Sequence, residues 1–149
     1  MKKFQFRLQP LLRYREYLER LAKIEVSNVL IDIAESEKRI DHAKDSRSVT
    51  ATRLDEESSR GISSERFRLF TNYIEGIEAF LETENEHRRQ LLELLVEKQK
   101  KLTQKSVEKK VLENLKKKRK EQYYGELRKS IQKEADDTII VRKARDINL

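Results

Sequence analysis

Residues that interrupt helices are nearly absent from this chain of 149 residues, which contains 1 proline and 3 glycines. No proline or glycine lies between Pro10 and Gly61, and only Gly76 and Gly125 follow. Pro10 is compatible with the first turn of a helix, because its missing N–H is not needed there. One helix can therefore run from about residue 10 to about residue 60, and a second can follow Gly61.

The apolar residues of both stretches recur with the alternating four-and-three spacing that is typical of a coiled coil. The first stripe begins with Leu11, Tyr14 and Leu18 and continues through Ala22, Val26, Val29, Ile33, Ser36, Ile40, Ala43, Arg47, Thr50 and Leu54. The second stripe is Phe67, Phe70, Ile74, Ile77, Leu81, Glu84, Arg88, Leu91, Leu95, Lys98 and Leu102, and continues less regularly through Val111, Leu115, Leu127 and Ile131. Neither helix can bury its stripe alone, so we expect an antiparallel hairpin.

The sequence GISS at residues 61–64 suits the corner of such a hairpin. Gly61 can adopt the left-handed conformation that ends a helix, Ser63 can cap the next helix, and Ile62 and Phe67 occupy the positions of a hydrophobic staple. The alternative is a flexible linker between separate helices. We expect an all-α fold of one elongated coiled-coil domain over residues 1–149. Helix one would span about 10–60, the turn about 61–63 and the longer helix two about 64–135, followed by a C-terminal tail.

Composition agrees with long helices and argues against a compact core or an enzyme. Charged residues form 41% of the chain, and there is no cysteine for a disulfide or a thiolate zinc site. There is no apolar run of signal-peptide or membrane-span length, so the simplest interpretation is a soluble cytoplasmic protein. Phosphate-loop, HExxH and GxSxG motifs are missing, and His42 and His87 are interpreted as ordinary solvated side chains. We expect no catalytic residue, no metal and no cofactor.

Two surfaces are candidates for binding. Tyr73 and Phe80 lie beside the stripe and flank Ile77, which gives this segment more apolar surface than a two-helix seam uses. This surplus indicates either a partner site or wider packing near the bend. The segment from Lys98 to Lys120 holds 11 Lys or Arg against 2 Glu, a net charge of +9. It could bind nucleic acid, acidic lipid or a protein, or simply be solvated. No RNA-binding module surrounds Tyr123 and Tyr124, so nucleic acid is not expected.

The opening residues FQFRLQPLLRYREYLE resemble the start of the FliJ family of flagellar type III export proteins. The match is carried by Phe4, Phe6, Arg7, Leu8, Leu11, Leu12, Arg15 and Glu16. The stretch GISSERFRLFTNYIEGIE also resembles the turn and second-helix start of that family. Residues 42–53, HAKDSRSVTATR, contain fewer aromatic residues than the same region of some relatives. Whether helix one also contributes to the partner surface is therefore left open.

The resemblance implies a non-enzymatic coiled coil similar to the central stalk of rotary ATPases. Its partners would be the hexameric export ATPase, the cytoplasmic part of the export gate membrane protein, and export chaperones, without nucleic acid or membrane insertion. It would be cytoplasmic and peripherally associated with the inner membrane at the flagellar base. The gate contact maps to Tyr73, Ile77 and Phe80. The ATPase contact is expected at the end that carries Arg7, Arg13, Arg15, Lys116, Lys117 and Lys118. The alternative is a generic coiled-coil scaffold or a rotary-ATPase stalk subunit.

Overall fold

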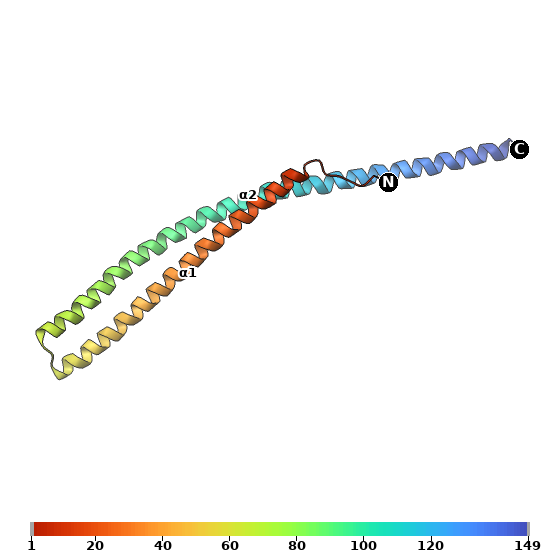
Figure 1. The fold of residues 1–149 in the computed structure, drawn as a ribbon. Coiled ribbons are helices and arrows are strands. Elements are labelled where there is room, and N and C mark those ends of the chain that lie inside the picture. The colour runs from red at the N-terminus through yellow and green to blue at the C-terminus, as the bar shows by residue number, and fades with distance from the viewer. Residues whose placement is uncertain (1, 149) are drawn as a thin grey trace. The chain divides into compact units, whose positions relative to one another are not determined.

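The computed structural model describes residues 2–148 and contains two helices, α1 (Gln9–Arg60) and α2 (Ser64–Ile147). No strand occurs in this part of the chain. The helices pack against each other as a hairpin in which the second helix is the longer, so the predicted all-α fold class is confirmed (Figure 1).

Residues 61–63 form the turn of the hairpin through the backbone chemistry expected of them. Gly61 has a φ of 87°, in the left-handed region that favours glycine, and its N–H donates to the Ser58 carbonyl at 3.2 Å. The N–H of Arg66 donates to Ser63 Oγ at 3.2 Å, which makes Ser63 the N-cap of α2. The predicted corner is therefore confirmed at both of these positions.

The C-terminal end of α2 differs from the expectation. We expected helix two to end near residue 135, but α2 continues to Ile147. Residues 128–148 are all exposed, so burial of a stripe does not hold this segment. It remains helical because no proline or glycine follows Gly125 and most of its side chains are compatible with a helix.

The chain divides into two compact units. Unit 1 comprises Met1–Glu19 and Gln104–Leu149, and unit 2 comprises Arg20–Thr103. In unit 2 the predicted seam is confirmed. Every predicted position from Ala22 to Leu54 is buried or half-buried, and so is every position from Phe70 to Leu102. Phe67 is the exception at 48% exposed.

Two apolar clusters form the core of unit 2. The first consists of Ile40, Ala43, Ile77 and Leu81. The second consists of Val29, Ile33 and Leu91, with Leu95 packed against it. Each cluster combines residues of both helices, so the four-and-three spacing of each arm is satisfied by the other arm.

A polar layer interrupts this apolar seam. Ser36 is fully buried, and its Oγ donates to Glu84 Oε1 at 2.9 Å. Arg39 Nε donates to the same carboxylate oxygen at 2.9 Å. The carboxylate therefore has partners from α1 although it lies inside the seam. A buried carboxylate without partners would be strongly unfavourable, so this layer favours one alignment of the two helices.

The predicted start of the first stripe was wrong, because α1 buries other residues in unit 1. Leu11 and Tyr14 are 40% and 54% exposed, whereas Leu12 is 3% and Glu19 is 5% exposed. The seam continues upstream of Ala22 through Leu12, Arg15 and Glu19, with Leu18 half-buried beside it. Ion pairs with α2 explain the polar residues in this seam. Glu19 lies 3.0 Å from Lys109 Nζ, and Arg15 lies 2.6 Å from Glu108.

The α2 side of unit 1 needs the same correction. Val111 and Ile131 are 61% and 45% exposed, so the irregular continuation of the second stripe was wrong at these two positions. Leu115 and Leu127 are half-buried. The half-buried positions of α2 in this unit that continue the four-and-three spacing are Lys105, Lys109, Leu112 and Lys116. Lysine takes such places because its long stem packs while its ammonium group reaches a carboxylate or water.

Candidate functional site

A groove of about 470 Å³ runs between the two helices of unit 2 and is called the apolar groove here. The buried residues Ala43 and Ile77 contribute to its lining. Tyr73 and Phe80 on α2 also line it and are 55% and 43% exposed. The α1 side supplies Lys38, Arg39, His42 and Ser46. An apolar lining beside basic side chains can receive an apolar side chain of a partner that also carries acidic residues.

The exposed apolar surface continues past Tyr73 toward the turn. Tyr73 also lines a second hollow of about 360 Å³, together with Thr50, Arg53, Arg66, Leu69 and Phe70. Leu69 is 70% exposed, which is unusually high for a large apolar side chain beside a hollow. Tyr73 therefore lies between two adjacent hollows of one surface.

Arg66 organises the second hollow. Its Cζ lies 5.6 Å from the centroid of the Phe70 ring, a cation–π geometry. Its Nε and Nη2 donate to the two carboxylate oxygens of Glu57 at 2.6 and 2.7 Å. This pair lowers the pKa of the Glu57 carboxyl and raises the pKa of the Arg66 guanidinium, chiefly through the hydrogen bonds between them. The pair joins α1 and α2 next to the turn.

The structure distributes the three residues of the predicted gate contact between two environments. Tyr73 and Phe80 present exposed rings along the apolar groove. Ile77 is only 9% exposed and packs with Ile40, Ala43 and Leu81. Ile77 therefore supports the groove from the core, while the two rings form the accessible part of its lining.

The polar layer supports the basic side of the apolar groove. Arg39 lines the groove, and its guanidinium is held by Glu84 through Nε at 2.9 Å and Nη2 at 2.8 Å. Hydrogen bonds from Arg39 first, and from Ser36 to a smaller extent, lower the pKa of the Glu84 carboxyl. The carboxylate stays ionised near neutral pH and fixes the position of Arg39. Residue pattern alone did not reveal this connection. The only indication of this connection in the sequence is that the polar residues Ser36 and Glu84 occupy positions in the otherwise apolar stripes.

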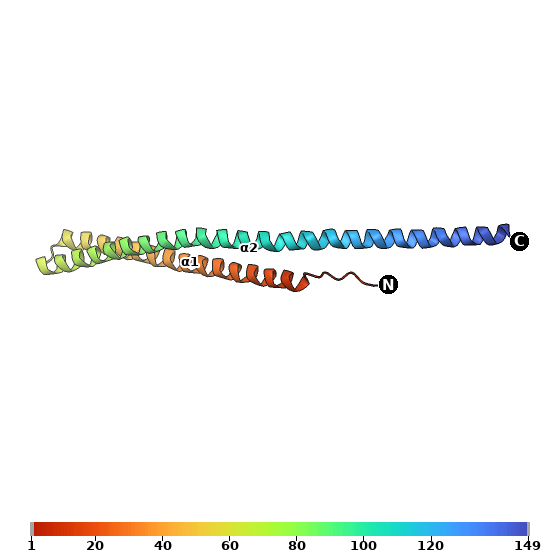
Figure 2. The same ribbon diagram turned by 90° about the horizontal axis from the view of Figure 1, so that it is seen from above.

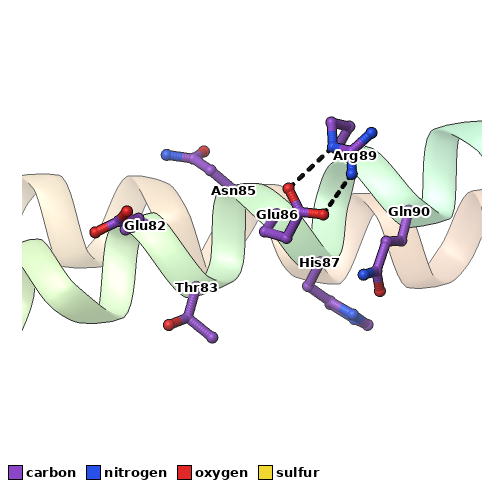
Figure 3. A pocket seen from close by; sticks show the side chains of 7 residues that line it. All are labelled: Glu82, Thr83, Asn85, Glu86, His87, Arg89 and Gln90. Atoms are coloured by element: carbon purple, nitrogen blue, oxygen red, sulfur yellow. Dashed lines mark hydrogen bonds and ion pairs between the residues drawn. The ribbon is translucent and has the colours of Figure 1, made fainter.

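A larger hollow of about 860 Å³ lies along α2 but lacks the features of a ligand site. Its lining consists of Glu82, Thr83, Asn85, Glu86, His87, Arg89 and Gln90, all on α2. Figure 3 shows these side chains projecting to different sides of the helix instead of converging on one point. Glu86 and Arg89 pair with each other at 2.5 Å, and hydrogen bonds from Arg89 lower the pKa of Glu86. The hollow is a polar helix surface.

The six residues of the predicted ATPase contact all belong to unit 1. Arg7, Arg13, Lys117 and Lys118 are exposed, and within residues 2–148 none of them forms an ion pair. Arg15 is already held by Glu108 at 2.6 Å, and Lys116 is half-buried. The structure therefore leaves four of these six side chains fully available to an anionic partner.

A non-helical N-terminal segment, residues 2–8, lies against α2 in unit 1, ends in a turn at residues 7–8 and is called the strap (Figures 1 and 2). The hydroxyl of Tyr123 donates to the carbonyl of Lys2, and the rings of Phe4 and Tyr123 lie 5.7 Å apart. Phe6 is 8% exposed, and its carbonyl accepts from the N–H of Gln9 at 3.0 Å. The strap thus connects Tyr123 to the start of α1. Sequence reasoning treated these aromatics separately, because nothing along the chain relates residue 4 to residue 123.

Two kinds of site have no structural support in the described residues. Within residues 2–148 no group of three or more His, Asp or Glu side chains is arranged to hold a metal ion. In the same range no helix has the length and apolar character that crossing a membrane requires.

The family model of the flagellar FliJ protein matches residues 4–146, which include both the strap and the turn. Neither the curated proteins nor the solved structures gave a match. Because the family model covers nearly the whole chain, this protein belongs to the FliJ family and is a flagellar, export-related protein.

Proposed function

We propose that this chain is a non-enzymatic coiled-coil stalk that links the hexameric export ATPase to the membrane export gate and interacts with export chaperones. It would act in the cytoplasm, peripherally associated with the inner membrane at the flagellar base. The observation that carries the proposal is the apolar groove with the exposed rings of Tyr73 and Phe80. A two-helix coiled coil that served only as a spacer between other proteins would not need an exposed apolar groove.

The groove supports a gate contact for two physical reasons. Aromatic side chains at the centre of an interface contribute much of its binding energy when they become fully buried. Tyr73 and Phe80 are exposed in the free chain, so each has area left to bury. Lys38 on the α1 side forms no ion pair within residues 2–148 and would favour a partner surface that carries carboxylates. The expected partner surface is therefore apolar at its centre and acidic at its rim.

The gate contact is tested by Tyr73→Ala combined with Phe80→Ala, which removes both exposed rings and leaves Ile77 in the core. We expect binding to the purified cytoplasmic part of the gate protein to weaken by about 1,000-fold, since two such anchors contribute about 2 kcal/mol each, or about 4 kcal/mol together. Leu92→Ala with Val96→Ala is the matched control. These two apolar residues of the same unit are 39% and 51% exposed and lie outside the groove.

Isothermal titration and swimming in soft agar are the two measurements. Full binding and normal swimming by the Tyr73 and Phe80 variant, with unchanged helicity, would refute the gate assignment. Equal losses in the Leu92 and Val96 variant would show that the surface is not specific. Ile77→Ala is unsuitable for this purpose, because loss of its buried contacts would also destabilise the hairpin.

The exposed basic residues of unit 1 support the ATPase contact. Lys117 and Lys118 have no ion pair in the described part of the chain, so an acidic surface of the ATPase can engage them directly. Lys117→Glu with Lys118→Glu is expected to weaken assembly of the ATPase ring and its stimulation. Lys129→Glu with Lys133→Glu makes the same charge change on exposed positions of the same helix.

Hexamer formation by the purified ATPase and its rate of ATP hydrolysis distinguish the two variants. If both double variants stimulate the ATPase like the wild type, the cluster is not part of the mechanism. If both fail equally, only net charge matters and the assignment to Lys117 and Lys118 is wrong. Chaperone binding has no surface assigned to it and is checked by pull-down with the purified chain.

A further inference from the structure

Eight basic residues from two distant parts of the sequence gather in unit 1. Three are on the strap and five on α2, and together they are called the cationic collar. They are Lys2, Lys3, Arg7, Lys116, Lys117, Lys118, Arg119 and Lys120. The strap is anchored at Tyr123 and ends where α1 begins at Gln9. It therefore lies alongside the part of α2 that carries the basic run.

The collar lacks acidic partners in the described part of the chain, unlike Lys105 and Lys109, which precede it on α2. Lys105 lies 3.8 Å from Glu108, and Lys109 lies 3.0 Å from Glu19. Among residues 2–148, none of the eight collar residues forms an ion pair. Unit 1 as a whole contains 19 basic and 10 acidic residues, a net charge of +9, whereas unit 2 has a net charge of −2. Like charges held together in this way favour binding of an anionic partner.

Aromatic residues accompany the collar. Tyr123 and Phe4 are in ring contact, and Tyr124 packs edge-on against Tyr123 at 5.4 Å while remaining 41% exposed. Tyrosine beside lysine is the combination enriched where proteins meet the headgroup region of a bilayer. A single-stranded nucleic acid would instead need free ring faces for base stacking. Here Phe4 and Tyr123 use their rings on each other.

The chemistry of the collar also favours a lipid surface over nucleic acid. Of its eight residues, 6 are lysine and 2 are arginine. Arginine is the residue that reads bases and grips single phosphates in bidentate fashion, whereas clusters of four to eight lysines suit diffuse attraction to an anionic membrane. We propose that the cationic collar binds the surface of bilayers that contain acidic phospholipids, with no helix entering the hydrocarbon layer. Arg7, Lys116, Lys117 and Lys118 also belong to the proposed ATPase contact, so a bilayer and the ATPase would compete for this surface, whereas the proposed gate residues belong to unit 2.

The test uses the purified full-length chain alone with vesicles. The collar variant Lys2→Gln, Lys3→Gln, Arg119→Gln and Lys120→Gln removes four charges and keeps every residue of the proposed ATPase contact. The control variant Lys129→Gln, Lys133→Gln, Arg142→Gln and Lys143→Gln removes four charges from exposed positions of α2 outside the collar. Net charge is therefore the same in both variants.

Cosedimentation with phosphatidylcholine vesicles, with and without phosphatidylglycerol, measures the partition coefficient. Wild type is expected to bind only the vesicles with phosphatidylglycerol, and binding should weaken as salt rises. Each collar charge contributes about fivefold to partitioning, so the collar variant, which lacks four charges, should lose about 600-fold. The control variant should stay within about tenfold of wild type. Far-ultraviolet circular dichroism verifies that both variants remain helical.

Four results would overturn the proposal. These are binding that ignores phosphatidylglycerol, equal losses in the two variants, tighter binding to a duplex or single-stranded oligonucleotide at matched phosphate concentration, and displacement by inorganic phosphate beyond the effect of ionic strength. The last result would assign the collar to free phosphate. Because no ATPase or gate protein is present, failure here leaves the proposed stalk function untouched, and failure of the stalk function leaves this result standing.

Discussion

The buried carboxylate of Glu84 is expected to stabilise the hairpin in a pH-dependent way, and Glu84→Gln tests this. Glu84 Oε1 accepts hydrogen bonds from Ser36 Oγ at 2.9 Å and from Arg39 Nε at 2.9 Å. Hydrogen bonds to a charged group contribute about 1.5–3 kcal/mol, against about 0.5–1.5 kcal/mol for neutral ones. Glutamine keeps the shape and an accepting oxygen but not the charge. Two weakened bonds predict a loss of about 1–2 kcal/mol, since Arg39 is partly in solvent and screened.

The pH dependence follows from the direction of the pKa shift. The pKa of Glu84 is lowered in the folded chain by the hydrogen bonds from Arg39 and Ser36. Its contribution is therefore fully present above the unfolded carboxyl pKa of about 4.3 and is lost as the pH falls through the folded value. Wild type and Glu84→Gln should differ near neutral pH and converge in acid, where both side chains are uncharged.

Urea denaturation followed by far-ultraviolet circular dichroism across this pH range is the measurement. Glu86→Gln is the matched control, because Glu86 is paired with Arg89 on the exposed surface of the same helix and its loss should have little effect. The reasoning fails if Glu84→Gln is as stable as wild type at neutral pH. It also fails if the difference persists unchanged in acid, because the charge would then not be its origin.

Three further changes address the turn and the seams. Gly61→Ala should destabilise the hairpin by about 1–2 kcal/mol, because alanine disfavours the positive φ of 87° although nothing lies within 4 Å to clash with its methyl group. Leu81→Ala should cost about 2–5 kcal/mol through loss of buried contacts, and the two variants are compared by urea denaturation. Lys109→Gln should lower the melting temperature and do so at high salt too, because its partner Glu19 is 5% exposed and thus poorly screened. A deficit that disappears in salt would contradict that explanation.

The amino-acid pattern predicts the fold well where apolar residues mark the seam on both arms. From Ala22 onward the four-and-three spacing identifies the buried face of α1, and GISS identifies the corner. Upstream of Ala22 the most apolar stripe of α1 is not the buried one. Leu11 and Tyr14 face solvent, while Arg15 and Glu19 lie in the seam. Their places depend on Glu108 and Lys109, which a single arm cannot reveal.

The candidate site is predictable only in part, for a similar reason. Surplus aromatic residues indicated Tyr73 and Phe80, since each lies outside the stripe that the partner helix covers. The contribution of Arg39 and His42 to the apolar groove can be predicted only when the alignment of the two helices is known. The same holds for the contact between Phe4 and Tyr123. Spacing within one helix reports which face is buried. It does not report which residue of the other arm lies opposite.

The polar layer of Ser36 and Glu84 also restricts how the length of this hairpin can change during evolution. One residue inserted into either helix between the layer and the turn would rotate the flanking seam by about 100° and separate the two side chains. A full heptad added to both arms would preserve every facing pair. Relatives that retain the layer are therefore expected to differ in length on its turn side only within the turn itself or by matched heptads.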